Sequence, residues 1–366
     1  MTLPIDPATP PMEARPVTVL PAGPEWRYEP KWDGFRCLAY RDGDEVELRS
    51  KSGQDLGRYF PDVAAGLQQL QARRFVLDGE IVIPIDGRLS FEALQLRLHP
   101  AASRVRKLAA EHPALYIAFD ILAQPHQGLV VSLADRAFAE RRRALEVFAA
   151  GEPASPVLRL SPSLPDPGIA KGWLDDLGGD IDGIVAKRAD LPYLAGSRDG
   201  MQKYKPVHSA DCVVGGFRYG KNSNLVGSLL LGLYDAEGLL NHVGFTATLP
   251  ARDKPELTER LETLIEPPGF SGRAPGGPSR WSTERSGEWQ PLRPELVVEV
   301  RYDQVSEGRF RHGTALLRWR PDKAPRQCGF DQLPAAVGGA LAMLAGARSD
   351  PAGNRPRRAP AQTGVS

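Results

Sequence analysis

The sequence predicts an α+β domain of strands and helices followed by an all-β barrel domain, and three observations support this. From about residue 26 to 205, short apolar runs with strand character alternate with stretches of helical periodicity. Beyond residue 210, strand-like runs are separated by glycine-rich turns. Between the two regions, the character of the sequence changes near Pro206–Ala210, which predicts a domain boundary there.

The N-terminal residues 1–24 contain seven prolines, which predict an extended arm rather than a folded element. The domain boundaries that follow from the pattern place the first folded domain at residues 25–206 and the second at residues 207–332. Residues 333–366 are predicted to form a short helix, at Leu333–Leu344, and a disordered basic tail.

The strands of the first domain are predicted where β-branched, aromatic and apolar residues gather. These runs are Arg36–Tyr40, Glu45–Arg49, Phe75–Ile83, Leu115–Leu122 and Gly183–Lys187. Apolar residues at helical spacing predict helices at Phe60–Ala72, Phe91–Leu98 and Leu133–Ala150. The Asp42-Gly43-Asp44 sequence predicts a hairpin between the first two strands.

The second domain has five strand-like runs and one helical stretch at about Lys254–Ile265, a pattern typical of an oligonucleotide-binding (OB) barrel. The strand-like runs are Cys212–Arg218, Ser228–Tyr234, Leu239–Phe245, Val297–Tyr302 and Ala315–Trp319. Gly215–Asn222 nearly matches the phosphate-binding loop Gly-x4-Gly-Lys-Ser/Thr. However, Asn222 lacks the metal-binding hydroxyl and a strand follows in place of a helix, so a hairpin is predicted.

The composition excludes several classes of protein. Lys and Arg total 46 against 45 Asp and Glu, so a nucleic-acid surface must come from local clustering rather than from overall charge. The three cysteines form no Cys-x-x-Cys pair, which argues against a disulfide framework or a zinc ribbon and favours a reducing cytoplasm. No apolar run reaches membrane-spanning length, so no membrane partner is predicted.

Lys31 is the most informative single residue, because it lies in an apolar run, Glu29-Pro30-Lys31-Trp32-Asp33-Gly34. Burying an ammonium group is costly, and a lysine that acts as a nucleophile needs its free-amine form. A four-residue Lys-x-Asp-Gly pattern is weak alone, since a lysine in a salt bridge at a strand end would explain it equally well. The remaining charged residues of the domain decide between these readings.

Four further sites pair charge with a predicted strand, in a fixed order along the chain. They are Asp78-Gly79-Glu80, Phe119-Asp120, Asp182 through Lys187, and Lys203-Tyr204-Lys205. Each alone is explained by a salt bridge or a solvated charge, but together they suggest one chemistry. Glu80 and Asp182 offer oxygen ligands to a divalent metal, and Lys203 and Lys205, two residues apart on one strand face, would neutralise phosphates. Phe119 and Val185 would enclose a planar base while Lys31 attacks a phosphorus atom.

This order of motifs resembles the covalent nucleotidyltransferase superfamily of DNA ligases, RNA ligases and mRNA capping enzymes. The resemblance covers about residues 26 to 330, and Lys31-Trp32-Asp33-Gly34 is similar to the motif whose lysine becomes adenylylated. The other similar motifs are Ser50–Gly53, Asp78–Glu80, Tyr116–Asp120, Asp182–Val185, Lys203–Lys205 and Arg318–Lys323. Two positions depart from the family pattern: Lys51 stands where arginine is usual, and Asp182 where glutamate is commoner.

Size and the Arg318–Lys323 ending most resemble the small bacterial ATP-dependent DNA ligases, which are accessory repair enzymes. The resemblance implies an adenylation (nucleotidyltransferase, ATP-grasp-like) domain of antiparallel sheets and helices, followed by an all-β OB-fold barrel. NAD-dependent ligases carry zinc-finger modules, and their cysteine clusters are missing here. An RNA ligase or a GTP-dependent capping enzyme is the alternative within this chemistry. A non-catalytic OB-fold nucleic-acid binder is the alternative of another class.

The resemblance also implies ligands and partners. ATP would be the AMP donor, with Mg²⁺ as the metal and Mn²⁺ able to substitute, and nicked duplex DNA would be the substrate. Proteins of end joining or base-excision repair would be partners of a monomer in the bacterial cytoplasm, associated with the nucleoid. Beside Lys31 as the catalytic residue and Glu80 and Asp182 as metal ligands, the nucleotide would contact Glu29, Arg36, Lys51, Glu80, Phe119, Val185, Arg198, Lys203, Lys205, Arg320, Asp322 and Lys323.

Overall fold

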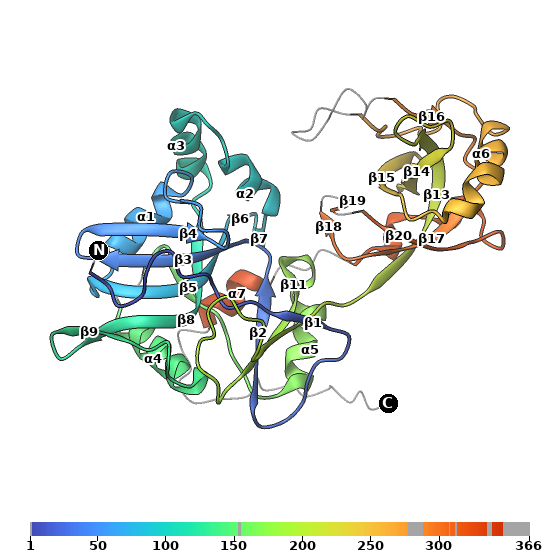
Figure 1. The fold of residues 1–366 in the computed structure, drawn as a ribbon. Helices are drawn as coiled ribbons and strands as arrows, with labels where there is room; N and C mark the ends of the chain where they lie inside the picture. Colours follow the sequence, from blue (N-terminus) through green and yellow to red (C-terminus); the bar gives the residue numbers. More distant parts are fainter. Residues whose placement is uncertain are drawn as a thin grey trace, which may run out of the picture. The chain divides into compact units, whose positions relative to one another are not determined.

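The computed structural model describes residues 2–152, 155–276, 288–306, 308–311, 313–334 and 339–346. These residues divide into two compact units (Figure 1). The first unit comprises residues up to Tyr204 together with the described residues 339–346, and the second begins at Lys205. The division lies two residues before the boundary expected between residues 206 and 207.

A six-stranded sheet forms one half of the first unit, in the order β10-β8-β5-β3-β4 with β9 paired to β8. All its pairs are antiparallel except β10 with β8. Helices α1 and α4 bury apolar side chains, among them Val63, Leu67 and Leu145, in one core with this sheet. The elements are β3 (Phe35–Asp42), β4 (Glu45–Ser50), α1 (Pro61–Gln68), β5 (Arg74–Val82), β8 (Leu115–His126), β9 (Leu129–Ser132), α4 (Phe138–Gly151) and β10 (Leu158–Leu160).

A four-stranded sheet in the order β1-β12-β11-β2 forms the other half. Trp173 of helix α5 and Leu344 of helix α7 pack with Tyr28 and Ile184 of this sheet in a second core. Helix α7 follows the second unit in the chain but belongs to the first unit, as Figure 1 shows. The elements are β1 (Arg15–Val17), β2 (Trp26–Trp32), α5 (Pro167–Asp176), β11 (Ile181–Arg188), β12 (Met201–Tyr204) and α7 (Ala340–Gly346).

The N-terminal residues belong to the folded part of the first unit, which differs from the extended arm expected at residues 1–24. Ile5 and Met12 are buried in a core cluster with Leu38, Tyr40 and other side chains of the six-stranded sheet. β1 pairs in parallel with β12. The segment makes a turn at Asp6–Thr9, and its spaced apolar side chains bury enough surface to hold it against the sheets.

The first unit contains several elements that the sequence pattern did not reveal. Helix α3 was not predicted, although Val105, Leu108 and Ala109 stand at helical spacing, because this apolar stripe is short and only Val105 is fully buried. By contrast, α1, α2 and α4 were predicted, and the structure confirms them, with α1 and α2 ending earlier and α4 beginning later than predicted. The small elements of this unit are β6 (Pro84–Ile85), β7 (Arg88–Leu89), α2 (Phe91–Arg97) and α3 (Ala102–Glu111).

The second unit is OB-like, with strands in the order β15-β14-β13-β17-β20 and β16 paired to β13. An isolated parallel bridge between Thr246 and Thr314 joins the end of β15 to the residue before β20. All five predicted strands are present. The elements are β13 (His208–Tyr219), β14 (Val226–Tyr234), β15 (Leu240–Thr246), α6 (Lys254–Glu262), β16 (Gln290–Pro291), β17 (Val297–Tyr302), β18 (Val305–Ser306), β19 (Arg309–Phe310) and β20 (Ala315–Trp319).

The near match to a phosphate-binding loop is a hairpin, as predicted. β13 and β14 pair antiparallel on either side of it, and Asn222 in the turn adopts a φ of 54°. Gly220 lies in the turn, whereas Gly215 and Gly216 lie within β13, where a Cβ would collide with Phe270 and Trp289. The predicted basic tail lies outside the described residues, except where α7 reaches residue 346.

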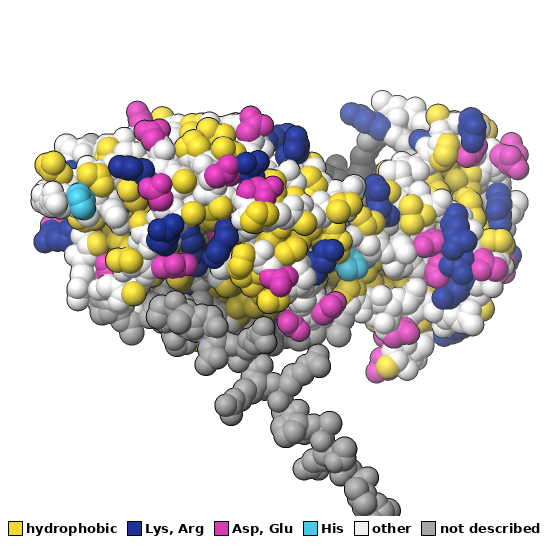
Figure 2. Space-filling view, turned by 90° about the horizontal axis from the view of Figure 1, so that it is seen from below, with side chains coloured by type: hydrophobic (Ala, Val, Ile, Leu, Met, Phe, Trp, Pro, Cys, Tyr) yellow, Lys and Arg dark blue, Asp and Glu magenta, His cyan; other side chains and the backbone are white. Residues whose placement is uncertain are grey.

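On the face drawn in Figure 2, basic and acidic side chains are interspersed over each unit, in keeping with the balanced composition. Across the described part of the chain, no helix combines the length and the apolar character needed to cross a membrane.

Candidate active site

Lys31 lies on β2 opposite an irregularity of its neighbour β11. In the pairing of these strands, Asp182 and Gly183 together oppose the single residue Lys31. Such a β-bulge turns a side chain out of the regular alternation and is common next to active sites. Gly183 permits it with a φ of 140°, which residues with a Cβ rarely adopt. As a result, Asp182 Oδ2 lies 2.5 Å from Lys31 Nζ.

The turn after β2 brings Lys31 close to β5. A Cβ atom at Gly34 would lie 2.3 Å from the backbone oxygen of Ile81 and 2.8 Å from Glu80 Cγ. Only glycine allows this approach, which explains why Asp33 is followed by glycine in a chain that must place Lys31 beside Glu80.

β5 presents Asp78 and Glu80 on the same face, because strand side chains alternate. Asp78 is fully buried and accepts hydrogen bonds from Arg36 Nε at 2.7 Å and Nη2 at 2.6 Å. The Tyr193 hydroxyl donates to the same carboxylate at 2.6 Å. Burial alone would lower the pKa of Arg36, but the Asp78 carboxylate outweighs burial and raises that pKa. Arg36 is therefore a fixed, permanent cation.

Glu80 is only partly exposed and lines the same cavity as Lys31. Burial raises the pKa of its carboxyl group to about 7, although the nearby cations Lys31 and Arg36 oppose the shift. The carboxyl group is thus poised to ionise near neutral pH. A cation bound in the cavity would favour the ionised form.

Phe119 also lies at a β-bulge. In the pairing of β8 with β5, Phe119 is an extra residue between two paired positions, and its ring lines the cavity. Lys187 Nζ lies 4.6 Å from the ring centroid and Arg36 Cζ lies 4.9 Å from it. Val185, two residues before Lys187 on β11, lines the cavity as well. The two predicted base-binding residues are therefore brought together from different sheets.

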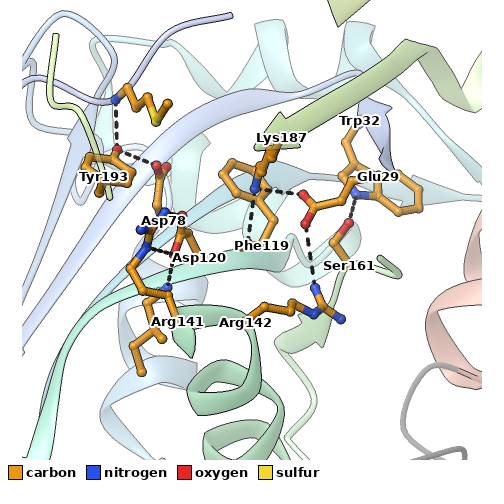
Figure 3. A network of polar contacts seen from close by, with 12 residues as sticks. Glu29, Trp32, Asp78, Phe119, Asp120, Arg141, Arg142, Ser161, Lys187 and Tyr193 are labelled. Carbon is orange, nitrogen blue, oxygen red and sulfur yellow. Dashed lines mark hydrogen bonds and ion pairs between the residues drawn. The ribbon is translucent and has the colours of Figure 1, made fainter. Parts of the chain in front are cut away.

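A buried network lies behind the ring (Figure 3). Lys187 Nζ is 2.8 Å from Glu29 Oε2 and donates to the backbone oxygen of Phe119 at 3.2 Å. Arg142 Nη1 of α4 lies 3.8 Å from Glu29 Oε1, too far for a hydrogen bond. Within the described residues, Glu29 Oε1 has no hydrogen-bond donor although Glu29 is 2% exposed. A bound ligand with an N–H group could satisfy this acceptor.

A cavity of about 200 Å³ unites these groups. It is lined by most of the residues that the sequence predicted for the first unit, namely Glu29, Lys31, Arg36, Lys51, Glu80, Phe119, Val185 and Lys203. Residues separated by more than 170 positions in the chain thus meet at one site.

Two other predicted cations, Lys51 and Arg198, meet at Glu13. Lys51 Nζ lies 3.0 Å from Glu13 Oε1, and Arg198 Nε lies 3.2 Å from Glu13 Oε2. The hydrogen bond from Lys51 lowers the pKa of the Glu13 carboxyl group, and Arg198 adds to the effect. Lys51 lines the cavity together with Glu13.

The expectation that Lys203 and Lys205 share one strand face is wrong. β12 ends at Tyr204, so only Lys203 lies on the strand and in the cavity lining. Lys205 is the first residue of the second unit. Pro206 follows it, and proline has no N–H with which to continue a ladder of hydrogen bonds.

The predicted residues of the second unit gather around Asp211. Arg320 Nη1 lies 2.7 Å from Asp211 Oδ1, and Lys323 Nζ lies 3.1 Å from Asp211 Oδ2. Arg320 also binds Asp322, and this hydrogen bond lowers the pKa of the Asp322 carboxyl group to about 2. Arg320, Asp322 and Lys323 therefore form one cluster within the second unit.

Sequence reasoning missed Lys187 and Glu13. Lys187 had a signal, since it lies two residues after Val185 and must share its strand face. Glu13 had none, because it lies in a proline-rich segment without periodicity.

Comparison with known families assigns both units. Residues 11–205 match the ATP dependent DNA ligase domain, and residues 222–323 match the ATP dependent DNA ligase C terminal region. The first match alone spans just over half of the chain. The chain belongs to the ATP-dependent DNA ligase family.

Individual ligases resemble the chain along most of its length. DNA ligase C1 of Mycolicibacterium smegmatis is 46% identical over 345 residues, which cover 91% of this chain and 96% of that protein. The multifunctional non-homologous end joining DNA repair protein LigD of Mycobacterium tuberculosis is 32% identical over 313 residues, covering 83% of this chain and 37% of that protein. A solved Lig E DNA ligase has the same fold, with a TM-score of 0.52, 17% identity, and coverage of 85% of this chain and 99% of that one.

ATP-dependent DNA ligases use a divalent metal, and the donor set of this site fits one. Magnesium is commonly held by one or two protein carboxylates together with water and substrate phosphates. Asp182 and Glu80 supply two carboxylates beside Lys31. Among the described residues no group of three or more His, Cys, Asp or Glu could by itself hold a metal ion.

Proposed function

We propose that the protein seals 5′-phosphate/3′-hydroxyl nicks in duplex DNA through a covalent Lys31–AMP intermediate. The observation that carries this proposal is the position of Lys31. Its amine lines one cavity with Glu80, Phe119 and Lys203, and Asp182 Oδ2 holds it at 2.5 Å. No ordinary surface salt bridge would need this convergence of an aromatic ring, carboxylates and cations.

In the first step, Lys31 Nζ attacks the α-phosphorus of ATP in its free-amine form. An N–P bond forms, the bond from the α-phosphorus to the bridging oxygen breaks, Nζ loses its proton and pyrophosphate leaves. AMP then passes to the 5′-phosphate at the nick, and the 3′-hydroxyl displaces AMP to form the phosphodiester. Asp182 fixes Nζ for in-line attack, and positioning of this kind accounts for much of the rate in phosphoryl transfer.

The cavity supports specific roles for its other residues. The adenine base would lie between Phe119 and Val185, where Glu29 Oε1, which lacks a hydrogen-bond donor, could accept a hydrogen bond from it. The phosphates would contact Arg36, Lys51, Arg198, Lys203 and Lys205. The pyrophosphate would contact Arg320, Asp322 and Lys323. Glu80 and Asp182 would hold Mg²⁺, for which Mn²⁺ can substitute, and the metal would supply charge neutralisation at the phosphates.

We also propose a role in DNA repair. A relative is named for non-homologous end joining, and the small accessory ligases that this sequence resembles act in repair. Proteins of end joining or base-excision repair would then be partners of a monomeric enzyme in the cytoplasm, associated with the nucleoid.

The decisive experiment follows the covalent intermediate. The protein is incubated with metal and ATP labelled at the α-phosphate, and Lys31→Ala should abolish the label that stays on the protein after denaturation. Lys171→Ala, at an exposed lysine of α5, serves as the matched control and should label normally. Label that persists in Lys31→Ala would contradict the proposal.

The alternatives separate in the same assay. Labelling by GTP in place of ATP would favour a capping enzyme, and preferential sealing of nicked RNA would favour an RNA ligase. A non-catalytic binder would bind DNA in a salt-dependent manner without acquiring label. We expect ATP, and not NAD, to support sealing of a 5′-phosphorylated DNA nick.

A further inference from the structure

Glu13 binds two of the cations that the proposed function assigns to phosphate. Its two carboxylate oxygens are divided between Lys51 at 3.0 Å and Arg198 at 3.2 Å. The three residues come from three separate segments: the N-terminal strand region, the turn after β4, and the loop between β11 and β12. The Glu13 carboxylate thus bridges Lys51 and Arg198, which come from distant parts of the chain.

The backbone fixes the place of this carboxylate. Glu13 N donates to Ser197 O at 2.8 Å, and the neighbouring Met12 N donates to the Tyr193 hydroxyl at 2.9 Å. Met12 O in turn accepts from Arg36 Nη2 at 3.1 Å. Because both neighbouring peptide groups are anchored, only the side chain of Glu13 can move away from its partners.

The two cations themselves are free to reorient. The side chains of Lys51 and Arg198 are 61% and 66% exposed, whereas that of Glu13 is 26% exposed. Exposed ion pairs are weak and exchange readily. A phosphate oxyanion that enters the cavity beside Lys31 therefore meets Lys51 in the cavity lining, where Lys51 is already paired with Glu13, the carboxylate that also binds Arg198.

We propose that Glu13 is an internal competitor for the phosphate that Lys51 and Arg198 bind. Its carboxylate occupies these cations until a phosphate oxyanion, from ATP or from the DNA, displaces it. The inference rests on the proposed function, because it takes Lys51 and Arg198 as phosphate ligands. A ligand with several negative charges displaces one carboxylate more readily than a singly charged ligand does, so Glu13 selects for charge.

Glu13→Gln tests this directly, because the amide keeps the shape and the acceptor oxygen but removes the charge. In one arm, the rate of Lys31 labelling is measured against ATP concentration. In the other, enzyme already carrying AMP seals nicked DNA at increasing DNA concentration. We expect the half-saturating concentration to fall about threefold to tenfold in the arm whose phosphate displaces Glu13. This range corresponds to the one or two weak ion pairs, with Lys51 and Arg198, that the ligand no longer has to break.

Salt dependence provides a readout that a structural role would not change. Without the internal anion, the ligand neutralises cations that otherwise bind Glu13. We therefore expect the slope of log affinity against log salt concentration to steepen by about one unit in that arm. Asp44→Asn is the matched control, since it removes an exposed carboxylate that pairs with Arg73 on the surface at 2.6 Å.

A double variant locates the effect. In Lys51→Gln, the further change Glu13→Gln should alter the half-saturating concentration less than it does in the wild type, because the two residues interact directly. Half-saturating concentrations that stay unchanged or rise in both arms would overturn the inference and show that Glu13 only positions Lys51 and Arg198. Failure of the wild type itself to label Lys31 would instead overturn the proposed function.

Discussion

The two units hold their functional cations in opposite ways. In the first unit, Arg36 and Lys187 are bound by Asp78 and Glu29, which are 0% and 2% exposed. In the second, Arg320 shares its charge between Asp211 and Asp322, and the Asp322 side chain is 63% exposed. The first unit thus holds these cations through buried carboxylates alone, whereas in the second a buried carboxylate, Asp211, shares Arg320 with an exposed one, Asp322.

This difference separates positioning from exchange. Breaking a buried pair leaves an uncompensated charge, so buried pairs keep one geometry, and this suits the groups around the nucleophile. Exposed pairs contribute little to stability and release their partners readily, which suits groups that bind a transient anion such as pyrophosphate. Glu13 follows the exchangeable pattern although it lies in the first unit.

Asp78→Asn should cause the largest loss of stability, because it breaks the buried ion pair with Arg36. The amide can no longer balance the Arg36 cation, so the free energy of unfolding of the first unit should fall by about 3 kcal/mol. Arg36 would also lose its fixed position over Phe119, and labelling of Lys31 should slow. Thermal unfolding followed by circular dichroism measures the loss. Asp190→Asn, which removes a carboxylate paired with Arg188 on the surface, is the control, and an equal effect of the two variants would refute the distinction.

Glu80→Gln removes a carboxyl group whose pKa is raised, and this should change how stability depends on pH. The folded pKa of about 7 lies above the ordinary 4.5, so the contribution of Glu80 to stability is full below pH 4.5 and is lost as the pH rises through 7. Without ATP and metal, the wild type should therefore lose stability relative to Glu80→Gln between about pH 5 and pH 8. A constant difference in melting temperature across this range would argue against the raised pKa.

Asp322→Asn should have the smallest effect on stability. Because the pair with Arg320 is exposed, the melting temperature should stay within about 2 °C of the wild type. The dependence of Lys31 labelling on ATP should nevertheless change, since Arg320 becomes less tightly engaged. A large fall in melting temperature would show that this cluster is structural and would remove the contrast between the units.

Much of the fold could be predicted from local sequence. Buried strands such as β3, β5 and β8 are rich in apolar residues, and the strand that follows the near phosphate-binding loop identified it as a hairpin. The site residues of the first unit were predicted because costly charges interrupt those strands. Eight of them line one cavity.

What could not be predicted depends on tertiary contacts. The bulges at Asp182 and Phe119 exist only in the pairing of two strands, and neither strand alone specifies its register against the other. The apolar stripe of helix α3 is short and lies among charged residues. Glu13 is defined solely by partners 38 and 185 positions away in the chain. The structure thus supplies what periodicity lacks, the identity of each side chain's neighbours.

Helix α7 imposes an order on the synthesis of the molecule. Ala340 and Leu344 complete a core that also contains Trp173 and Ile181, yet they follow the entire second unit in the chain. On the ribosome, that apolar surface of the first unit stays uncovered while the OB-like unit emerges and folds. The catalytic unit of the nascent chain therefore exposes apolar surface until α7, one of the last described segments, is synthesised. Slow translation of the OB-like unit would lengthen the time in which this surface can bind chaperones or aggregate.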